Sequence, residues 1–270
     1  MKNQKIVVVI AAHSGDFEQA SRLINWIGEL DGKLPYWLII AVDQTVEVPR
    51  FTALHEAAKK VFNFVRTITL KVPETGWKPN TMFMYCAKYV HDNFSLPFLW
   101  LEPDCVPLKP GWLDAIAGAY NNSGLRYMGA IIEQTGQKNL PPRHLTGCSV
   151  YPNDAFETFD KMAEVTGGRQ AWDIAGGELV ATAAQNTPLI HHFWGEPKKW
   201  PVFVETKTPD MPENNVMLDF IKPEAVLFHR DKDSTLIPLL RKAKPAAELT
   251  DAELEKLTAP ETPAPNTTLE

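Results

Sequence analysis

Hydrophobic and polar residues follow one another along the first hundred positions in blocks of two kinds. Continuous apolar runs at 6–10 and 36–42 are typical of strands buried on both faces of a sheet. After the first run, Phe17, Ala20 and Leu23 recur at the spacing of one helix face. Strands are predicted over 6–10, 36–42, 65–72 and 98–101, and helices over 17–27, 52–62 and 80–94. This alternation predicts parallel strand pairing with right-handed crossovers.

The second half of the chain has a less regular pattern. Strands are predicted over 126–132, 147–151, 189–194 and 225–229, and helices over 153–165, 171–185 and 233–242. A long loop with several prolines, 195–223, separates the last two strands. We therefore expect an α/β protein with one domain over 1–245, in which a first half over about 1–110 differs from a second half over 111–245.

Charge is distributed unevenly along the chain. The net charge is -6, and residues 246–270 carry six acids and one lysine, so that this segment contributes -5 and the body only -1. The segment also becomes rich in proline and threonine, and we expect an acidic, partly disordered tail. A nearly neutral body does not suggest a protein that binds duplex nucleic acid through bulk charge, although a local basic groove stays open.

Several sequence motifs are missing, and their absence disfavours some classes of protein. No apolar run approaches the roughly 20 residues of a membrane span, and the first residues lack the pattern of a signal peptide. Cys86, Cys105 and Cys148 form no C-x-x-C pair, which disfavours a structural zinc site or a disulfide framework. The glycine-rich motifs of dinucleotide-binding and P-loop proteins are missing. We expect a cytoplasmic protein with no membrane partner.

The most informative segment joins an apolar strand to a pair of carboxylates. Residues 98–101 run directly into Glu102, Pro103 and Asp104, and a P-G-W sequence follows shortly after. Carboxylates two positions apart at a strand end point to the same side. Such a pair suits a hard divalent cation such as Mg²⁺ or Mn²⁺. Acidic residues and proline are also common in turns, but the preceding strand favours the metal interpretation.

The run L-E-P-D at 101–104 resembles the D-x-D motif of GT-A-fold nucleotide-sugar glycosyltransferases, with Glu in the first place. The order of predicted elements over 5–243 is also similar to theirs, particularly to the large inverting family. The resemblance implies a Rossmann-type nucleotide-binding half, an acceptor-binding half and a mixed sheet. It also implies a divalent cation, Mn²⁺ or Mg²⁺, and a donor such as a UDP-sugar. Asp104 would bind the metal, and Glu102 would lie at the bound donor.

The resemblance assigns further residues to the nucleotide. In GT-A enzymes the nucleotide lies over the C-terminal ends of the first strands, which places Ala12, His13 and Asp43 beside it. Asp43 would accept a hydrogen bond from the base or ribose, or would only cap its loop. Asn80 stands where similar enzymes place a polar residue against the ribose or base, and its simpler role is that of a helix N-cap.

Two segments resemble the acceptor side of these enzymes. Gly147 lies in a predicted strand where a glycine lets the backbone approach the donor sugar. Residues 169–178 occupy the place of the family's acidic pair, in which an aspartate opens a helix and serves as the general base. Asp173 is the better candidate for this base, and Glu178 is the second. Asp173 could instead simply cap the helix that follows it.

Two histidines compete for a further metal position. His229 ends the last predicted core strand, where many GT-A enzymes use a histidine, and Arg230 or Lys232 would then meet the diphosphate. His192 opens the segment H-F-W-G-E-P-K-K-W, which resembles the metal-binding H-F-x-G-x-x-K-P-W segment of glycogenin-like transferases. We prefer His229 because it ends a core strand and a basic stretch follows it.

Other interpretations of function stay open. A sugar-phosphate nucleotidyltransferase shares the nucleotide-binding half, but the sequence after the first strand lacks the basic glycine-rich loop of that class. A nucleotide-sugar-binding protein without catalysis is a second alternative. Asp173 as base would give inversion, whereas the glycogenin-like segment belongs to retaining enzymes. The acceptor would be a saccharide or a small molecule. Because W-L-E-P-D-x-x-P-x-x-x-G-W resembles bacteriophage transferases, a hydroxymethylated pyrimidine in DNA is a third candidate, in a bacterial or phage-infected cell.

Overall fold

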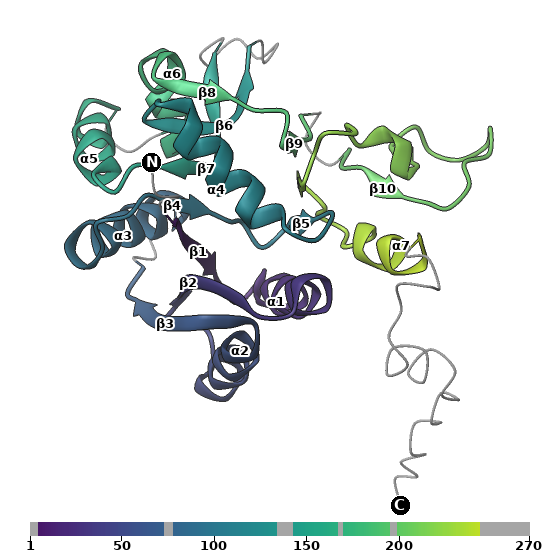
Figure 1. Cartoon of the computed structure of the whole chain (residues 1–270), viewed down its shortest axis with the longest axis horizontal. Helices are drawn as coiled ribbons and strands as arrows, with labels where there is room; N and C mark the ends of the chain where they lie inside the picture. The colour runs from purple at the N-terminus through teal and green to yellow at the C-terminus, as the bar shows by residue number, and fades with distance from the viewer. Residues whose placement is uncertain (1–4, 73–77, 134–142, 167–169, 195–198, 244–270) are drawn as a thin grey trace, which may run out of the picture.

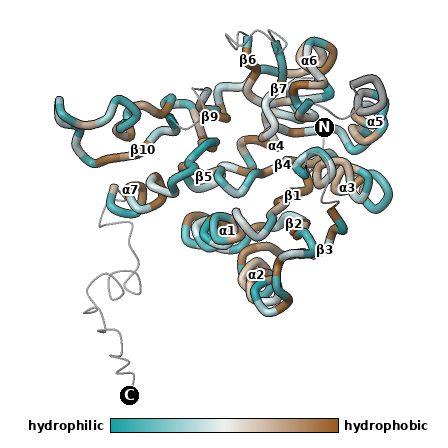
Figure 2. Tube along the Cα trace, turned by 180° about the vertical axis from the view of Figure 1, so that it is seen from behind, coloured by the Kyte–Doolittle hydropathy of each residue, from teal (hydrophilic) through white to brown (hydrophobic). Residues whose placement is uncertain are grey.

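The computed structural model describes residues 5–72, 78–133, 143–166 (backbone alone for 162–166), 170–194 and 199–243. A sheet flanked by helices forms the main body, and a smaller lobe with β10 and α7 lies to one side (Figure 1). Hydrophobic residues concentrate along the strands, and hydrophilic residues lie toward the outside (Figure 2). None of the helices in the described ranges combines the length and the apolar character that a bilayer span requires.

Seven strands form the main sheet in the order β3-β2-β1-β4-β7-β6-β8. Their bounds are Val7–Ala12 (β1), Leu34–Asp43 (β2), Phe62–Leu70 (β3), Phe98–Trp100 (β4), Tyr127–Ile132 (β6), His144–Tyr151 (β7) and Ala184–Asn186 (β8). β1 is parallel to β2 and β4, and β2 is parallel to β3. β7 is antiparallel to β4 and β6, and β8 is parallel to β6. The sheet is therefore mixed, and its parallel part comes from the first half of the chain.

Helices cover both faces of this sheet. One face carries α1 (Phe17–Asp31), α2 (Val48–Val61) and α4 (Trp112–Ser123), and the other carries α3 (Lys78–Asn93), α5 (Ala155–Thr166) and α6 (Trp172–Thr182). Val8 and Ile10 of β1 pack into the core under the first set, whereas Val7 and Val9 pack into the core under the second. Because successive strand side chains point to opposite faces, a strand between two helical layers is apolar at every position.

A second sheet brings distant segments of the chain together. Its order is β5-β12-β9, with bounds Cys105–Pro107, Leu227–His229 and Ile190–His192. β12 is antiparallel to β5 and parallel to β9. The short strands β10 (Val202–Phe203) and β11 (Asn215–Val216), a 3₁₀ helix (Leu218–Phe220) and α7 (Leu236–Ala243) complete the lobe. This sheet carries the end of the metal motif and both candidate histidines.

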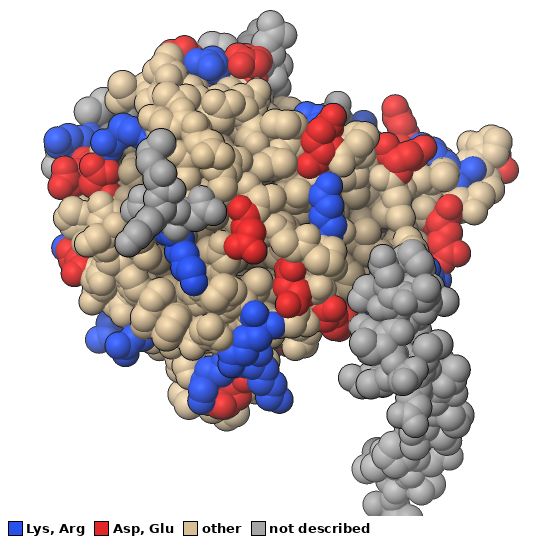
Figure 3. All heavy atoms as spheres, in the orientation of Figure 1, with Lys and Arg blue, Asp and Glu red and all other residues tan. Residues whose placement is uncertain are grey.

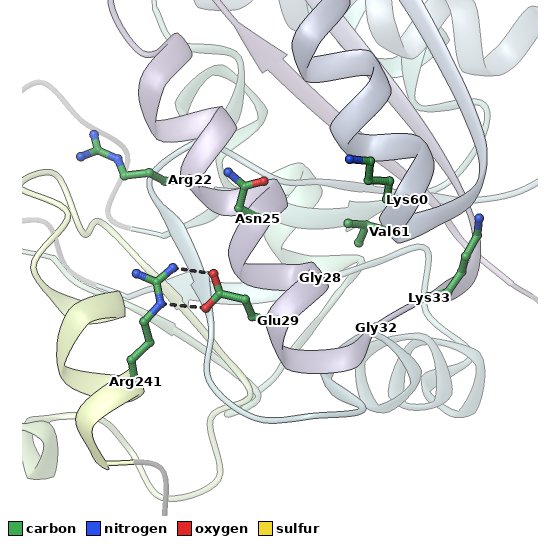
Figure 4. A pocket seen from close by; sticks show the side chains of 9 residues that line it. All are labelled: Arg22, Asn25, Gly28, Glu29, Gly32, Lys33, Lys60, Val61 and Arg241. Atoms are coloured by element: carbon green, nitrogen blue, oxygen red, sulfur yellow. Dashed lines mark hydrogen bonds and ion pairs between the residues drawn. The ribbon is translucent and has the colours of Figure 1, made fainter. Parts of the chain in front are cut away.

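Helix α1 anchors the lobe to the main body. The indole nitrogen of Trp26 donates a hydrogen bond of 2.7 Å to the carbonyl oxygen of Pro107 in β5. Arg241 of α7 donates two hydrogen bonds to the carboxylate of Glu29, at 2.7 and 2.6 Å (Figure 4). These contacts fix β5 and α7 relative to the parallel part of the sheet.

Most of the elements predicted from the pattern are present, and the α/β fold with a mixed sheet is confirmed. The predicted helix over 171–185 was too long, because α6 ends at Thr182 and β8 follows it. Gly177 interrupts α6 with φ 42°, which a continuous helix does not allow. β5 and α4 were not predicted separately, and the predicted loop 195–223 contains β10 and β11. The predicted tail, 246–270, lies outside the described residues.

Two glycines should respond oppositely to the same substitution. Gly129 of β6 faces Ser149 of β7, and a Cβ at Gly129 would lie 1.9 Å from the Ser149 hydroxyl oxygen. Gly129→Ala should lower the free energy of unfolding by about 1–3 kcal/mol through overpacking. Gly118, inside α4, has no atom within 4 Å of such a Cβ. Gly118→Ala should raise stability by about 0.5–1 kcal/mol, because alanine favours the helix. Equilibrium urea unfolding measures both, and equal effects would contradict this packing.

Candidate functional site

The carboxylates of Glu102 and Asp104 lie where the chain passes from the main sheet to the second sheet. β4 ends at Trp100, a turn follows in which the Cys105 amide donates to the Glu102 carbonyl at 2.9 Å, and β5 begins at Cys105. Asp104 is only 3% exposed, which is rare for an aspartate without compensating charges. The turn interpretation and the metal interpretation of this motif are therefore compatible, since the turn points both acids into the site.

His229 and Lys232 supply the compensating charges from the C-terminal end of the described chain. β12 pairs with β5 so that His229 stands opposite Cys105. The His229 Nε2 atom lies 3.1 Å from Glu102 Oε2 and 3.5 Å from Asp104 Oδ1. Lys232 Nζ lies 2.5 Å from Asp104 Oδ2. Two carboxylates and two cationic groups thus form one compact cluster, in which Asp104 and His229 are buried and Glu102 and Lys232 are partly exposed.

The electrostatics of this cluster strongly favour the charged forms. Burial disfavours the ionised carboxylate, but His229 and Lys232 outweigh that effect and hold the pKa of Asp104 far below its usual range. Burial similarly opposes ionisation of Glu102, and His229 lowers its pKa. Burial also opposes the imidazolium, yet the charges of Glu102 and Asp104 raise the pKa of His229 to about 10. The two carboxylates therefore favour the protonated form of His229.

The donor set of this cluster fits a hard divalent cation. One ligand atom each from Glu102, Asp104 and His229 lie within 4.8 Å of one another. Neither oxygen of Asp104 has a hydrogen bond of regular geometry within the described part of the chain, although both oxygens are buried. Two carboxylates with one imidazole suit Mn²⁺ or Mg²⁺ better than a thiophilic ion. The structure thus brings together the predicted metal ligands Asp104 and His229 with two of the predicted donor contacts, Glu102 and Lys232.

His192 lies behind His229 rather than beside the carboxylates. β9 and β12 are in register, so that His192 and His229 are direct neighbours, and their Nδ1 atoms are 2.8 Å apart. Burial and the positive charges of His229 and Arg230 lower the pKa of His192 well below its ordinary value. His192 is therefore a neutral partner of His229. The rest of the glycogenin-like motif, 195–198, lies outside the described residues.

Gly147 of β7 leaves space for the side chains of Glu102 and Trp172. A Cβ at this position of β7 would lie 2.5 Å from Glu102 Oε1 and 3.2 Å from the Trp172 ring. Only glycine therefore allows Glu102 and Trp172 to approach the strand this closely. The indole of Trp172 stacks on Phe83 with ring centroids 4.7 Å apart, which fixes the start of α6 against the core. The structure places the sequence-predicted Gly147 directly against Glu102.

Asp173 follows Trp172 in the first turn of α6. Ala171 takes the N-cap position, and the Asp173 carboxylate accepts a hydrogen bond of 2.9 Å from the Ile174 amide. Burial and the negative charge of Glu102 raise the pKa of Asp173 to about 6. Asp173 is thus a carboxyl group near Glu102 whose pKa lies close to neutrality. Glu178 is exposed and pairs with Arg143 at 3.3 Å.

The residues predicted at the nucleotide lie at the C-terminal ends of β1 and β2. Ala12 is the last residue of β1, and the His13 ring accepts a hydrogen bond of 2.8 Å from the Gly15 amide. Asp43 is buried at the end of β2 and accepts hydrogen bonds from the Thr45 amide and hydroxyl at 3.0 and 2.5 Å. Asp43 therefore caps its own loop in the structure.

Asn80 makes contacts that its sequence position did not indicate. It is the third residue of α3 rather than its N-cap. Its amide nitrogen donates to the Gln170 carbonyl at 2.5 Å, and its amide oxygen accepts from the Trp172 amide at 2.9 Å. Asn80 thus ties α3 to the segment that positions Trp172 and Asp173.

Arg230, predicted from the sequence together with Lys232 as a contact to the diphosphate, follows His229 directly. It has φ 95°, an unfavourable backbone conformation for any residue with a side chain. Its guanidinium lies over the Trp200 ring, 5.1 Å from the centroid, and its charge lowers the pKa of Asp173 against the larger effect of burial. Backbone strain next to a buried charged cluster is typical of functional sites. A sequence pattern carries no signal for a left-handed arginine.

A separate hollow lies between α1, α2 and α7, away from this cluster (Figure 4). It measures about 620 Å³ and is lined by Arg22, Asn25, Gly28, Glu29, Gly32, Lys33, Lys60, Val61 and Arg241. Glu29 is the one carboxylate among these lining residues, and Arg241 already pairs with it. The residues that line this hollow therefore provide no set of metal ligands. The cluster at Asp104 is the better candidate for a functional site.

No protein-family model and no curated protein sequence matches this chain. Among solved structures, the bifunctional glycosyltransferase WbbM is similar over 93% of this chain and 51% of its own, with a TM-score of 0.55 and 11% identity. This chain thus spans about half the length of WbbM.

The galactosyltransferase LgtC was solved in complex with donor and acceptor sugar analogues. Its structure is similar over 95% of this chain and 98% of its own, with a TM-score of 0.52 and 11% identity. An active-site variant of LgtC gives a TM-score of 0.53 at 12% identity. The protein therefore has the GT-A-like α/β fold of nucleotide-sugar glycosyltransferases.

Proposed function

We propose that this protein is a metal-dependent glycosyltransferase that moves a sugar from a nucleotide-sugar donor, such as a UDP-sugar, to an acceptor hydroxyl. The observation that carries the proposal is the buried cluster of Glu102, Asp104 and His229, whose ligand atoms lie within 4.8 Å of one another. It lies at the C-terminal end of β4 in the parallel part of the sheet, where α/β folds bind their ligands. The shared fold of LgtC and WbbM supports the same activity.

The cluster has the chemistry that a diphosphate leaving group requires. A divalent cation held by Glu102, Asp104 and His229 would neutralise charge on the diphosphate. Lys232 pairs with Asp104 now, but its side chain is 35% exposed and can turn toward a phosphate oxygen. Arg230, held over Trp200, adds a second positive charge at the same end of β12. These residues stabilise the negative charge that develops as the sugar–phosphate bond breaks.

We further propose that Asp173 is the general base of a single displacement with inversion. The acceptor oxygen attacks C1 of the sugar, and its proton passes to the Asp173 carboxylate. The C1–O bond to the diphosphate breaks, and the electron pair leaves with the phosphate oxygen. The position of Asp173, near Glu102 and in the first turn of α6, supports this role. Glu178 is less suited, because it is exposed and paired with Arg143.

For the acceptor we propose a saccharide or another small hydroxyl compound. Acidic and basic side chains are mixed over the face shown in Figure 3, and the body of the chain is nearly neutral. Duplex DNA binding usually depends on a concentrated set of positive charges. Because the sequence resembles bacteriophage transferases, DNA with hydroxymethylated pyrimidines is tested as a second acceptor.

The first test measures release of nucleoside diphosphate from a panel of sugar nucleotides with Mn²⁺ or Mg²⁺. At least one sugar nucleotide should be turned over, and Asp104→Asn should lower the rate by more than about 10²-fold, because charge stabilisation at the leaving group is lost. Asp92→Asn is the matched control, since Asp92 is an exposed aspartate on α3 that pairs with Lys88.

Other outcomes of this assay identify the rival functions. A nucleotidyltransferase would release pyrophosphate from a nucleoside triphosphate and a sugar phosphate. A binding protein would bind the sugar nucleotide in calorimetry without releasing nucleoside diphosphate. Near-normal turnover by Asp104→Asn would remove the metal assignment.

The second test concerns the base. Asp173→Asn keeps the size of the side chain but cannot accept the proton, so kcat should fall by about 10²–10⁴-fold with donor affinity nearly unchanged. Because Asp173 must be ionised to act, activity should rise with pH through about 6, and this rise should vanish in the variant. Glu178→Gln is the control. Full activity of Asp173→Asn, or a product with retained anomeric configuration by NMR, would overturn the assignment and the inverting mechanism.

The third test separates the two histidines by Mn²⁺ affinity, measured through the EPR signal of free Mn²⁺. His229→Ala removes a ligand and should weaken binding by more than about 100-fold. His192→Ala removes only the hydrogen-bond partner of that ligand and should weaken binding by about tenfold. The reverse ranking would make His192 the metal ligand and His229 its partner.

A further inference from the structure

Two of the three cysteines meet directly behind the candidate metal site. The Cys105 and Cys148 sulfurs are 3.3 Å apart, and both residues are almost completely buried. Cys105 follows Asp104 in the chain, and Cys148 follows Gly147, so each thiol neighbours a residue of the proposed active site. The structure has them as free thiols. The sugar-transfer chemistry proposed above uses neither of them.

His229 belongs to this thiol pair as well as to the carboxylate pair. One ligand atom each from Cys105, Cys148 and His229 lie within 4.8 Å of one another, and all three residues are buried. Strand pairing explains the contact, because His229 stands directly opposite Cys105 in the second sheet. His229 therefore belongs to two sets of possible metal ligands. One is a hard set with Glu102 and Asp104, and the other is a soft set with the two sulfurs.

We propose that Cys105, Cys148 and His229 form a second metal site, selective for thiophilic ions such as Zn²⁺, whose occupation excludes the catalytic cation. Tetrahedral zinc with bonds of about 2.3 Å to sulfur holds two thiolates about 3.8 Å apart, so the sulfurs need to separate by only about 0.5 Å. Binding replaces two S–H protons with two sulfur–metal bonds and releases both protons to solvent. No oxidant or reductant takes part.

The two metal sites exclude each other because both use the imidazole of His229. A neutral imidazole has a single nitrogen lone pair, so His229 can bind one metal ion at a time. Soft sulfur ligands select zinc-like ions, whereas the carboxylates select Mg²⁺ and Mn²⁺. An ion on the sulfur side therefore removes the imidazole ligand from the carboxylate side, and the enzyme would be inhibited by zinc without any change of fold.

The carboxylate side of the cluster is the side open to solvent. The Glu102 side chain is 26% exposed and the Lys232 side chain 35% exposed, whereas the His229 side chain is 1% exposed. An ion from solvent would thus meet Glu102 before His229 and the sulfurs. Because side chains must move before an ion can reach the sulfurs, we expect metal binding at the sulfur site to be slow. Occupancy should therefore be measured after long incubation.

Cobalt(II) tests the site directly, because thiolate–Co²⁺ bonds absorb strongly in the near ultraviolet. With a phosphine reductant present, wild-type protein should develop this absorption to one equivalent of Co²⁺, and Zn²⁺ should abolish it. Cys148→Ser and Cys105→Ala should each lose it. Cys86→Ser should keep it, since Cys86 is an equally buried thiol on α3 in a separate part of the core. Excess Mn²⁺ should raise the Co²⁺ concentration for half-saturation at least about tenfold, because His229 is shared.

Either of two spectral outcomes would overturn the proposal. No charge-transfer absorption, or absorption that persists in the Cys105→Ala/Cys148→Ala variant, would exclude a thiolate site even if one variant failed to fold. In protein that EPR shows to bind Mn²⁺, lack of competition by Mn²⁺ would exclude the shared His229. Zinc inhibition of nucleoside diphosphate release, relieved at least about tenfold in Cys148→Ser, is the only arm that rests on the proposed function, so its failure is distinguishable from failure of the spectral test.

Discussion

The Asp104 carboxylate, just after the end of β4, cannot be buried unless positive charge lies beside it. An isolated ionised carboxylate in a protein interior costs several kcal/mol even after relaxation, and Asp104 is only 3% exposed. His229 and Lys232 come from the far end of the described chain to neutralise this charge. The second sheet, the parallel pairing of β9 with β12 and the anchoring of the lobe on α1 all serve to deliver these two groups. The site thus links the two halves of the fold.

The approach of α6 to this cluster depends on missing side-chain volume and on backbone strain. Gly147 leaves the space that Glu102 and Trp172 fill, and Arg230 adopts a left-handed conformation beside His229. Each feature would be unfavourable in an ordinary core, where a side chain and a relaxed backbone stabilise the fold. Both are tolerated at the same place, around Glu102 and Asp104. Their coincidence supports the proposal that this arrangement serves ligand chemistry.

The alternation of apolar strands with amphipathic helices predicted the first half of the fold well, because periodicity reports which faces are buried. The Glu102–Asp104 motif was predicted for the same reason, since its strand runs straight into it. Contacts between distant segments could not be predicted in this way. Asn80 was expected at a ligand or a helix cap but ties α3 to Trp172, and Cys105 meets Cys148 across two sheets. Local pattern also could not show that β8 follows α6 at residue 184, where pairing with β6 overrides helix propensity.

On the proposed function, the charges of the cluster would couple cation binding to donor binding. Asp104 pairs with the Lys232 ammonium, and the two carboxylates raise the pKa of His229, which favours its protonated form. A divalent ion at this place competes with both positive charges, so its binding frees Lys232 and displaces the His229 proton. A diphosphate arriving with the donor gives the released ammonium a new anionic partner. On the proposed function, cation and donor would therefore reinforce each other, and by linkage each would raise the affinity for the other by the same factor.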